Sequence, residues 1–464
     1  MSTETTVISA AVETPTPGPR AARETGEPWP SPGRAWYAVF IFALSLMINF
    51  LDRGIVSLLV TPIKRDLNLT DVQVSLVMGF AFICCYVILG LPIARWADFR
   101  NRRTILGIGV MIWSLMTAAC GLAQSFWQLF VCRVGVGAGE ACSGPATYSM
   151  LADLFPPQRL PRAIAVLNFG FYAGMGLALI VGGTVTQLLV ELPPVTLPLI
   201  GPLRHWQSIF LVVGIPGLLV AALITTVREP RRRGTAFTAA GRPQPLPVRE
   251  VLTFIREQAP LFAPLFLGVG IETALAFGTG SWAPTFYLRT FGWTPARYGL
   301  VQGLIMISVL PVGAFIGSLL AERFARQGRP DANLRVVLIA QSLALPASVL
   351  FPLMPTPGLA LLVSTWSLFC QSWVAGPINA AIQITTPNQM RGQITALLLF
   401  IFNVIGFGLG PTAVAIFTDY VFHAEGQLGY SLSAAALVLG PLGLFAIRLS
   451  LKPYGRRVAA LTIH

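Results

Sequence analysis

Charged residues are scarce in this chain of 464 residues: only 11% are Asp, Glu, Lys or Arg, whereas 54% are hydrophobic. Soluble domains carry about 25% charged residues, so a body of this size with so little polar surface is not expected to stay in water. There are only three histidines (His205, His423 and His464) and two lysines (Lys64 and Lys452). Neither lysine follows a glycine, and the motifs HExxH and GxSxG are missing. These absences exclude a Walker-type ATP site, a zinc protease and a nucleophile-elbow hydrolase. We therefore expect neither enzymatic activity nor a cofactor.

The cysteines also show no spacing typical of a redox or metal site. All six cysteines fall within apolar runs, and none has CxxC or metal-ligand spacing: Cys84, Cys85, Cys120, Cys132, Cys142 and Cys370. They are typical of small apolar packing residues, and no metal site is predicted.

What the chain has in place of charge is long apolar runs. A membrane-spanning helix needs about 20 mostly apolar residues. Twelve runs meet this length: 35–60, 72–95, 104–124, 127–152, 163–190, 206–227, 261–288, 297–321, 334–353, 358–384, 393–418 and 429–450. They are continuously apolar and do not alternate, which excludes a β-barrel. The prediction is an all-α membrane protein with twelve transmembrane helices.

The twelve runs divide into two similar halves. Short loops with one acid and several arginines follow the second run (94–103) and the eighth run (317–329), and Pro-Gln-Arg-type loops follow the fourth and tenth. This repetition indicates two pseudo-symmetric six-helix bundles, an arrangement suited to alternating access around a central site. The predicted domains are a disordered N-tail (1–34), the first bundle (35–228), a linker with a short amphipathic helix (229–259), the second bundle (260–450) and a C-tail (451–464).

The net charge of +13 reflects topology more than a nucleic-acid partner. Of the 32 Lys and Arg residues, 25 lie in the tails and in loops on one side of the predicted membrane, and five lie in the opposite loops. This asymmetry places both termini in the cytoplasm. No cleavable signal peptide is predicted, so the first span directs insertion into a bacterial inner membrane, where lipids are natural contacts.

Three stretches carry a family resemblance: Asn49-Phe-Leu-Asp-Arg53, Arg133-Val-Gly-Val-Gly-Ala-Gly-Glu-Ala141 and Asp153-Leu-Phe-Pro-Pro-Gln-Arg159. Together with the 94–103 loop, they resemble the major facilitator superfamily and its spinster branch, the bacterial relatives of lysolipid and sphingosine-phosphate exporters. The loop departs from the superfamily motif at Ala94, Phe99 and Asn101, whereas Asp98, Arg102 and Arg103 match it. The anion–cation symporter branch shares part of the pattern.

The resemblance implies a rocker-switch transporter, a monomer, that is driven by the proton gradient. It implies that runs 1, 4, 7 and 10 line the cavity. It also implies proton coupling through Asp52 and Glu140, with Arg133 nearby.

The charged residues inside the apolar runs indicate the same candidate residues independently of the family resemblance. Asp52, Arg53, Arg133, Glu140 and Glu272 all lie within predicted spans, where one such charge costs about 2.5–3.5 kcal/mol on insertion scales. Arg133 and Glu140 are seven residues apart and share a helix face, whereas Arg53 points about 100° away from Asp52.

Asp52 and Glu140 are the predicted proton-coupling residues, because an acid whose arginine partner leaves during rocking changes its proton affinity. A static ion pair that clamps two helices is the alternative. Arg133 could instead bind an anionic headgroup. Arg53 serves another contact or extends toward the membrane surface, and Glu272 either lines the cavity or is a hydrogen-bonded structural group.

Further candidates follow from position. Aromatic and amide residues in the cavity spans would suit an amphiphile with a polar head: Asn49, Tyr148, Trp282, Tyr287, Gln371, Trp373 and Asn379. Five residues near the basic loops are candidates for gating: Asp98, Arg102, Arg103, Asp153 and Arg159. The glycines Gly135, Gly137, Gly139 and Gly144 favour close helix packing.

The sequence supports three functions. The first is a proton-coupled secondary transporter of an amphiphilic lipid-like molecule or organic anion, expected to be an exporter of lysolipid-like or sphingolipid-like molecules. The second is an organic anion:proton symporter that imports its substrate, or a multidrug-type exporter. The third is a receptor or scaffold that transports nothing.

Overall fold

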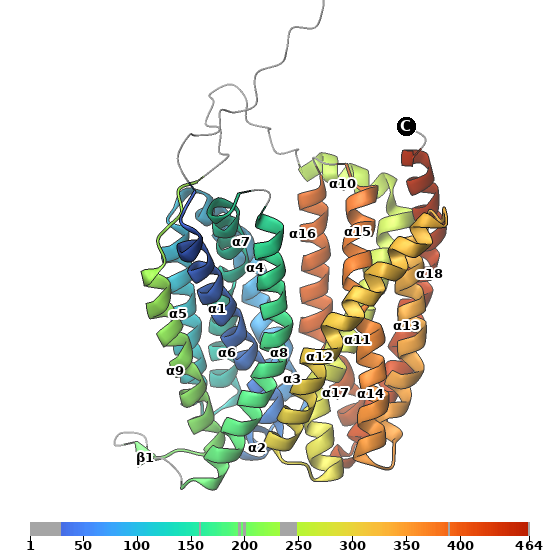
Figure 1. Cartoon of the computed structure of the whole chain (residues 1–464). Coiled ribbons are helices and arrows are strands. Elements are labelled where there is room, and N and C mark those ends of the chain that lie inside the picture. Colours follow the sequence, from blue (N-terminus) through green and yellow to red (C-terminus); the bar gives the residue numbers. More distant parts are fainter. Residues whose placement is uncertain are drawn as a thin grey trace, which may run out of the picture.

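The computed structural model of the chain describes residues 29–156, 159–193, 196–197, 201–232, 248–387 and 390–462. Most of the predicted N-tail and most of the linker lie outside these residues. The described residues form two helical bundles that stand side by side (Figure 1). Short helix α10 (Val248–Glu257) and the end of α18 lie at one end of the molecule, called here the α10 end. Short helix α2 (Val60–Leu67) lies at the opposite end, called the α2 end.

The first bundle contains helices α1 to α9, which make the first six membrane crossings. Its helices are α1 (Pro32–Leu58), α2, α3 (Asp71–Ser75), α4 (Ala81–Phe99), α5 (Arg102–Cys120), α6 (Phe126–Glu140), α7 (Ser143–Leu154), α8 (Leu160–Glu191) and α9 (His205–Thr226). A π-helical turn, η1 (Leu76–Phe80), joins α3 to α4. Two short antiparallel strands, β1 (Thr196–Leu197) and β2 (Gly201–Pro202), lie between α8 and α9.

The second bundle contains α11 to α18. Its helices are α11 (Ala259–Phe291), α12 (Pro295–Arg326), α13 (Ala332–Leu350), α14 (Pro357–Ser372), α15 (Ala375–Thr385), α16 (Arg391–Ile401), α17 (Gly410–Ile416) and α18 (Leu428–Thr462). Two 3-10 helices, η2 (Phe351–Leu353) and η5 (Glu425–Gln427), and two π-helices, η3 (Phe402–Leu409) and η4 (Phe417–Phe422), complete it. Helix α18 continues to Thr462, so much of the predicted C-tail is helical.

Eleven helices in the described part of the chain are long and apolar enough to cross a membrane. The remaining crossing is the fourth, which the sequence predicted as one run over 127–152. It is divided into α6 and α7 at Ala141 and Cys142. Pro145 explains the division, because it has no N–H to donate to the carbonyl of Ala141. The tenth crossing is divided in the same way before Pro377, between α14 and α15. The twelve-helix architecture and the pairing of crossings four and ten thus agree with two related halves.

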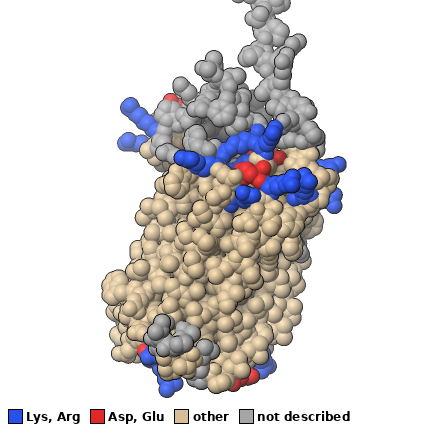
Figure 2. Space-filling model, turned by 90° about the vertical axis from the view of Figure 1, so that its left-hand side faces the viewer, with Lys and Arg blue, Asp and Glu red and all other residues tan. Residues whose placement is uncertain are grey.

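The outside of the molecule matches a membrane protein. Figure 2 shows Lys, Arg, Asp and Glu gathered at the two ends, with a broad band free of charged side chains between them on that face. Large hydrophobic side chains are exposed to the surroundings, for example Phe40, Leu362 and Phe445, which are 64%, 68% and 62% exposed. Lipid, and not water, is the environment that makes such exposure favourable.

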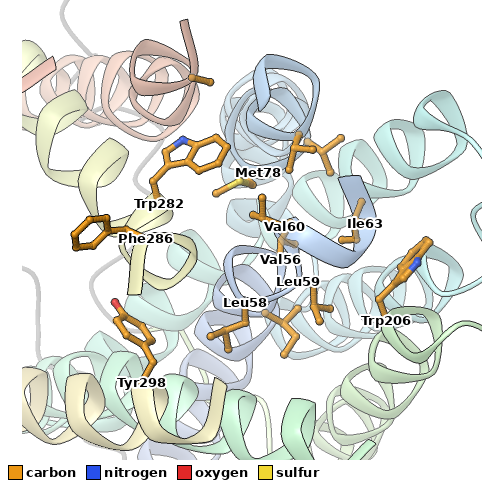
Figure 3. Close-up of a cluster of buried hydrophobic side chains, with 14 of the residues drawn as sticks. Val56, Leu58, Leu59, Val60, Ile63, Met78, Trp206, Trp282, Phe286 and Tyr298 are labelled. Carbon is orange, nitrogen blue, oxygen red and sulfur yellow. The ribbon is translucent and has the colours of Figure 1, made fainter. Parts of the chain in front are cut away.

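The buried core is divided unevenly between the two ends. At the α2 end, one apolar cluster contains residues of both bundles, including Val56, Leu58 and Met78 of the first and Trp282 and Phe286 of the second (Figure 3). The other two clusters are formed by fully buried residues of one bundle each. One contains Phe42, Trp113 and Leu151; the other contains Phe262, Ile382 and Tyr454. The bundles therefore share a core at the α2 end and have separate cores toward the α10 end.

Candidate functional site

Two ion pairs join α1 to α6 inside the first bundle. Arg133 donates to Asp52 with an Nη1–Oδ1 distance of 3.3 Å, and Arg53 donates to Oε2 of Glu140 from Nη2 at 2.6 Å and Nε at 3.0 Å. Neighbouring residues of α1 thus bind residues of α6 that lie seven positions, or about 10 Å, apart. The short Asp52 meets the long Arg133, and the long Arg53 reaches Glu140.

The two pairs differ in their access to solvent. The side chains of Arg133 and Asp52 are 0% and 2% exposed, whereas Arg53 is 14% exposed and its partner Glu140 is 0% exposed. Several atoms of these groups have no hydrogen-bond partner among the described residues: Oδ2 of Asp52, Oε1 of Glu140, and Nε and Nη2 of Arg133. Each carboxylate therefore keeps one oxygen unpaired, although buried polar groups are normally satisfied.

Aromatic rings surround the Arg53 guanidinium. Its carbon Cζ lies 4.2 Å from the ring centre of Phe82, 5.1 Å from that of Phe407 and 5.6 Å from that of Tyr86. Rings at these distances attract a cation through their electron-rich faces. Phe407 belongs to the second bundle, so Arg53 contacts both halves of the protein. The guanidinium therefore keeps favourable contacts even when it is not paired with Glu140.

Glycines allow the helices around this site to approach closely. A Cβ atom on Gly137 would collide with the carbonyl oxygen of Phe82, and one on Gly139 would lie 2.6 Å from the backbone nitrogen of Trp113. A Cβ on Gly135 would meet the side chain of Met116. The predicted packing role holds for these three glycines. Gly144 has open space around it, so the prediction does not extend to it.

A partly open cavity lies between the two bundles beside Arg53. Its enclosed volume is about 180 Å³, smaller than the roughly 300–1,000 Å³ of typical ligand sites, so a large cargo needs the cavity to widen. Most of its lining is apolar and comes from both bundles, including Phe50, Met78, Met175, Phe277, Met306, Phe351 and Leu368. Arg53 is the charged residue among those that line it in the described part of the chain.

Uncharged polar groups form a stripe on the second-bundle side of the same cavity. Ser364, Ser367 and Gln371 lie on one face of α14, and Gln302 comes from α12. Gln371 Nε2 donates to Ser367 Oγ at 2.8 Å, and the Tyr287 hydroxyl lies 3.5 Å from Ser364 Oγ. The sequence analysis missed the serines and Gln302. The spacing of residues 364, 367 and 371 on one helix face was the available signal.

Two of the seven predicted cavity residues, Tyr287 and Gln371, line this cavity. The prediction needs correction for three others, which are buried against neighbouring helices. Asn49 is 4% exposed, and Trp373 is 7% exposed and packs on Gly317. Trp282 is fully buried, and its Nε1 donates to the Pro411 carbonyl at 2.9 Å because this face of α11 is turned toward α17.

The remaining candidates lie elsewhere. Tyr148 on α7 is 49% exposed, and Asn379 on α15 is exposed with its amide donating to the Ala375 carbonyl. Glu272 is 8% exposed and packs against Gly443 of α18, away from the cavity lining. Its Oε1 has no hydrogen-bond partner among the described residues.

The predicted gating residues gather in part at the α10 end. Arg102 is 1% exposed and pairs with Asp153 at 2.5 Å and Glu229 at 2.8 Å. Arg103 donates to the carbonyls of Thr225 and Val227. All these contacts stay within the first bundle and tie α5 to α7 and to the chain after α9. Arg159 is exposed, and Asp98 lies in α4 with its side chain outside the described ones.

Comparisons with known proteins agree with this architecture. Residues 42–411 match the family model described as Major Facilitator Superfamily. The chain is 29% identical to the MFS-type efflux pump of Mycolicibacterium smegmatis, over 84% of this chain and 85% of that protein. It is also 29% identical to human Protein spinster homolog 1, over 65% of this chain and 57% of that protein. The matched region thus spans little more than half of the human protein.

Among solved structures, the fold is similar to that of a bacterial homolog of the human lysosomal transporter Spinster, in an inward-facing and unoccupied conformation. The TM-score is 0.70 with 24% sequence identity, and the match covers 94% of this chain and 99% of that one.

Proposed function

The chain belongs to the Major Facilitator Superfamily, with spinster homologs among its relatives, and we propose that it is a proton-coupled transporter of an amphiphile with a charged headgroup. Membership of this family makes it a multi-pass membrane transporter of small molecules. The finer proposal rests on one observation: Arg53 lies at the wall of the cavity and is held there by Glu140.

An ionised Glu140 neutralises the single positive charge of Arg53. It also occupies Nε and Nη2, one of the two nitrogen pairs through which a guanidinium binds a carboxylate or phosphate in a fork. A proton on Glu140 removes that competition and frees Arg53 for an anionic headgroup. Proton and anion then load together and travel in the same direction. Phe50, Met78, Met175 and other apolar residues of the cavity wall suit the hydrocarbon part of the cargo.

A cationic headgroup gives the opposite coupling at the same site. The unpaired Oε1 of Glu140 offers such a group a partner, and a proton on Glu140 prevents its binding. Cargo and proton then exchange, and an inward proton gradient drives export. The similarity to an efflux pump favours this second candidate. An anionic cargo thus corresponds to uptake with the proton and a cationic cargo to export in exchange for it. The sequence analysis left both directions open.

Transport in proteoliposomes tests the proposal. Thermal-shift screening of lipids, lysolipids, organic anions and organic cations first identifies a bound cargo, since a ligand of the native state raises apparent stability. Its flux is then measured with an imposed pH gradient of either direction. We expect Glu140→Gln to lose the response to the gradient, to keep the binding of an anionic cargo and to lose the binding of a cationic cargo. The exposed-site control Glu322→Gln should behave as wild type. Gradient-driven flux that persists in folded Glu140→Gln protein would contradict proton coupling through this residue.

A further inference from the structure

A second group of charged residues lies at the α2 end, outside the cavity and on both bundles. Lys64 of α2 pairs with Asp71 of α3 at 2.6 Å and with Glu425 of η5 at 2.8 Å. The first contact stays within the first bundle, whereas the second joins the two bundles. Asp71 is fully buried, although Glu425 is 57% exposed. Lys64 therefore links an acid of each half.

Arg289, at the end of α11, extends this group from the opposite bundle. Its guanidinium lies 3.9 Å from Asp71 and 3.6 Å from Glu425, and its Nε donates to the Thr61 hydroxyl at 3.3 Å. Two basic residues thus stand among acids that belong to different bundles. Ile63, the residue before Lys64, belongs to the shared apolar cluster of Figure 3. The pairs with the buried Asp71 are weakened less by salt than those with the exposed Glu425.

Asp419 makes the most specific contact between the bundles. From η4 of the second bundle, its carboxylate accepts hydrogen bonds from the backbone nitrogens of Val72 at 2.7 Å and Asp71 at 3.3 Å. These N–H groups belong to the first turn of α3, where a helix has no partners of its own. The carboxylate also meets the positive end of the helix dipole.

The other amides of this turn are satisfied within the first bundle. The Gln73 nitrogen donates to the Thr70 hydroxyl, and the Val74 nitrogen donates to the Thr70 carbonyl. The second bundle thus supplies partners for two N–H groups that helix α3 cannot satisfy itself. When the bundles part, water can solvate these groups, so the contact is reversible.

At the α10 end, the ion pairs of the described residues stay within one bundle, as in Arg102–Asp153 and Arg335–Asp331. We propose that Lys64, Asp71, Arg289, Asp419 and Glu425 form a latch that holds the bundles together at the α2 end and opens in every transport cycle. Asp419 is its central residue. The need for cyclic opening rests on the proposed function, whereas the closing effect of the latch does not.

Hydrogen–deuterium exchange on the purified full-length protein tests the latch without cargo or a proton gradient. Asp419→Ala removes both backbone contacts, and Asp419→Asn keeps an oxygen acceptor but no charge. Glu322→Gln serves as the control, because this exposed residue pairs with Arg326 on the same helix, α12, at the opposite end. Circular dichroism checks that each variant is folded.

We expect Asp419→Ala to speed exchange at least about tenfold, because bonds to charged groups are worth about 1.5–3 kcal/mol. The faster exchange should cover residues 60–76 and, in addition, the facing seam of α8 and α12, where Gly183 and Gly299 pack backbone to backbone. Asp419→Asn should give an intermediate effect, and Glu322→Gln none. Unchanged exchange, or faster exchange confined to residues 70–76, would overturn the latch and leave Asp419 a local helix cap. Because no flux is measured, this outcome is independent of the transport test.

Discussion

The two ion pairs between α1 and α6 should respond differently to the loss of one partner. Asp52→Asn preserves the shape of the side chain and removes its charge. Arg133 then remains fully buried at 0% exposure, with Nε and Nη2 already lacking partners among the described residues. Removing one member of a buried pair costs about 3–5 kcal/mol, because the remaining charge is uncompensated. We expect a loss of this size in the free energy of unfolding.

Glu140→Gln should cost much less. Its partner Arg53 is 14% exposed, lines the cavity and lies 4.2 Å from the ring centre of Phe82. A cation over an aromatic ring keeps about 0.5–2 kcal/mol of attraction, and water in the cavity can solvate the rest of the guanidinium. We therefore expect a loss of about 1 kcal/mol, by comparison with partly exposed pairs.

Steric trapping or reversible denaturation in micelles measures the free energy of unfolding of both variants. A double variant, Asp52→Asn with Arg133→Met, provides the control, because it removes the stranded charge and should recover much of the stability lost in the single variant. Equal destabilisation by Asp52→Asn and Glu140→Gln would refute the distinction between a structural pair and an exchangeable pair. So would a double variant that is less stable than Asp52→Asn alone.

Three further outcomes follow from the packing. Gly137→Ala should destabilise the protein by about 1–3 kcal/mol through collision with α4, whereas Gly144→Ala, with open space around it, should be neutral in a thermal melt. Arg102→Lys should lower the unfolding free energy by about 2 kcal/mol, because one ammonium cannot replace the fork between Asp153 and Glu229; equal melting temperatures would contradict this. Glu272→Gln should retain transport and stability, since this carboxyl faces α18 and not the cavity; loss of gradient-driven flux would contradict that placement.

The sequence predicted the fold and the buried charged residues, because both follow from the length of the apolar runs and from the charged residues inside them. Apolar length determines how many helices can cross, and an Asp, Glu or Arg inside such a run is costly wherever the helix lies. The break in the fourth crossing was readable from Pro145 but was not predicted. The residues Asp52, Arg53, Arg133 and Glu140 were therefore all identified before their partners were known.

The partners of those charged residues were harder to predict from the sequence. Helical spacing placed Arg133 and Glu140 on one face and left Arg53 for another contact, yet Arg53 is the partner of Glu140. The angle between neighbouring residues of a helix locates Cβ atoms, and an arginine side chain is long enough to overcome it. The cavity lining was also difficult to predict, because a serine or a buried tryptophan in a membrane helix looks alike whether it faces a cavity or a neighbour. Trp282 and Ser364 illustrate the two errors.

The division of the core connects the two sites. At the α2 end, the bundles share an apolar cluster, and charged residues of both halves pair around it. If they part there, Asp419 leaves α3, and Phe407, which contacts Arg53 from the second bundle, moves away as well. Arg53 then loses an aromatic neighbour while Glu140 stays on the same bundle, so in the proposed mechanism the competition between Glu140 and cargo for Arg53 changes with the conformation. A site held entirely within one bundle could not sense this movement, and the Asp52–Arg133 pair is such a site. In the proposed coupling, the contact of Arg53 with the second bundle therefore makes the proton affinity of Glu140 depend on the side to which the cavity opens.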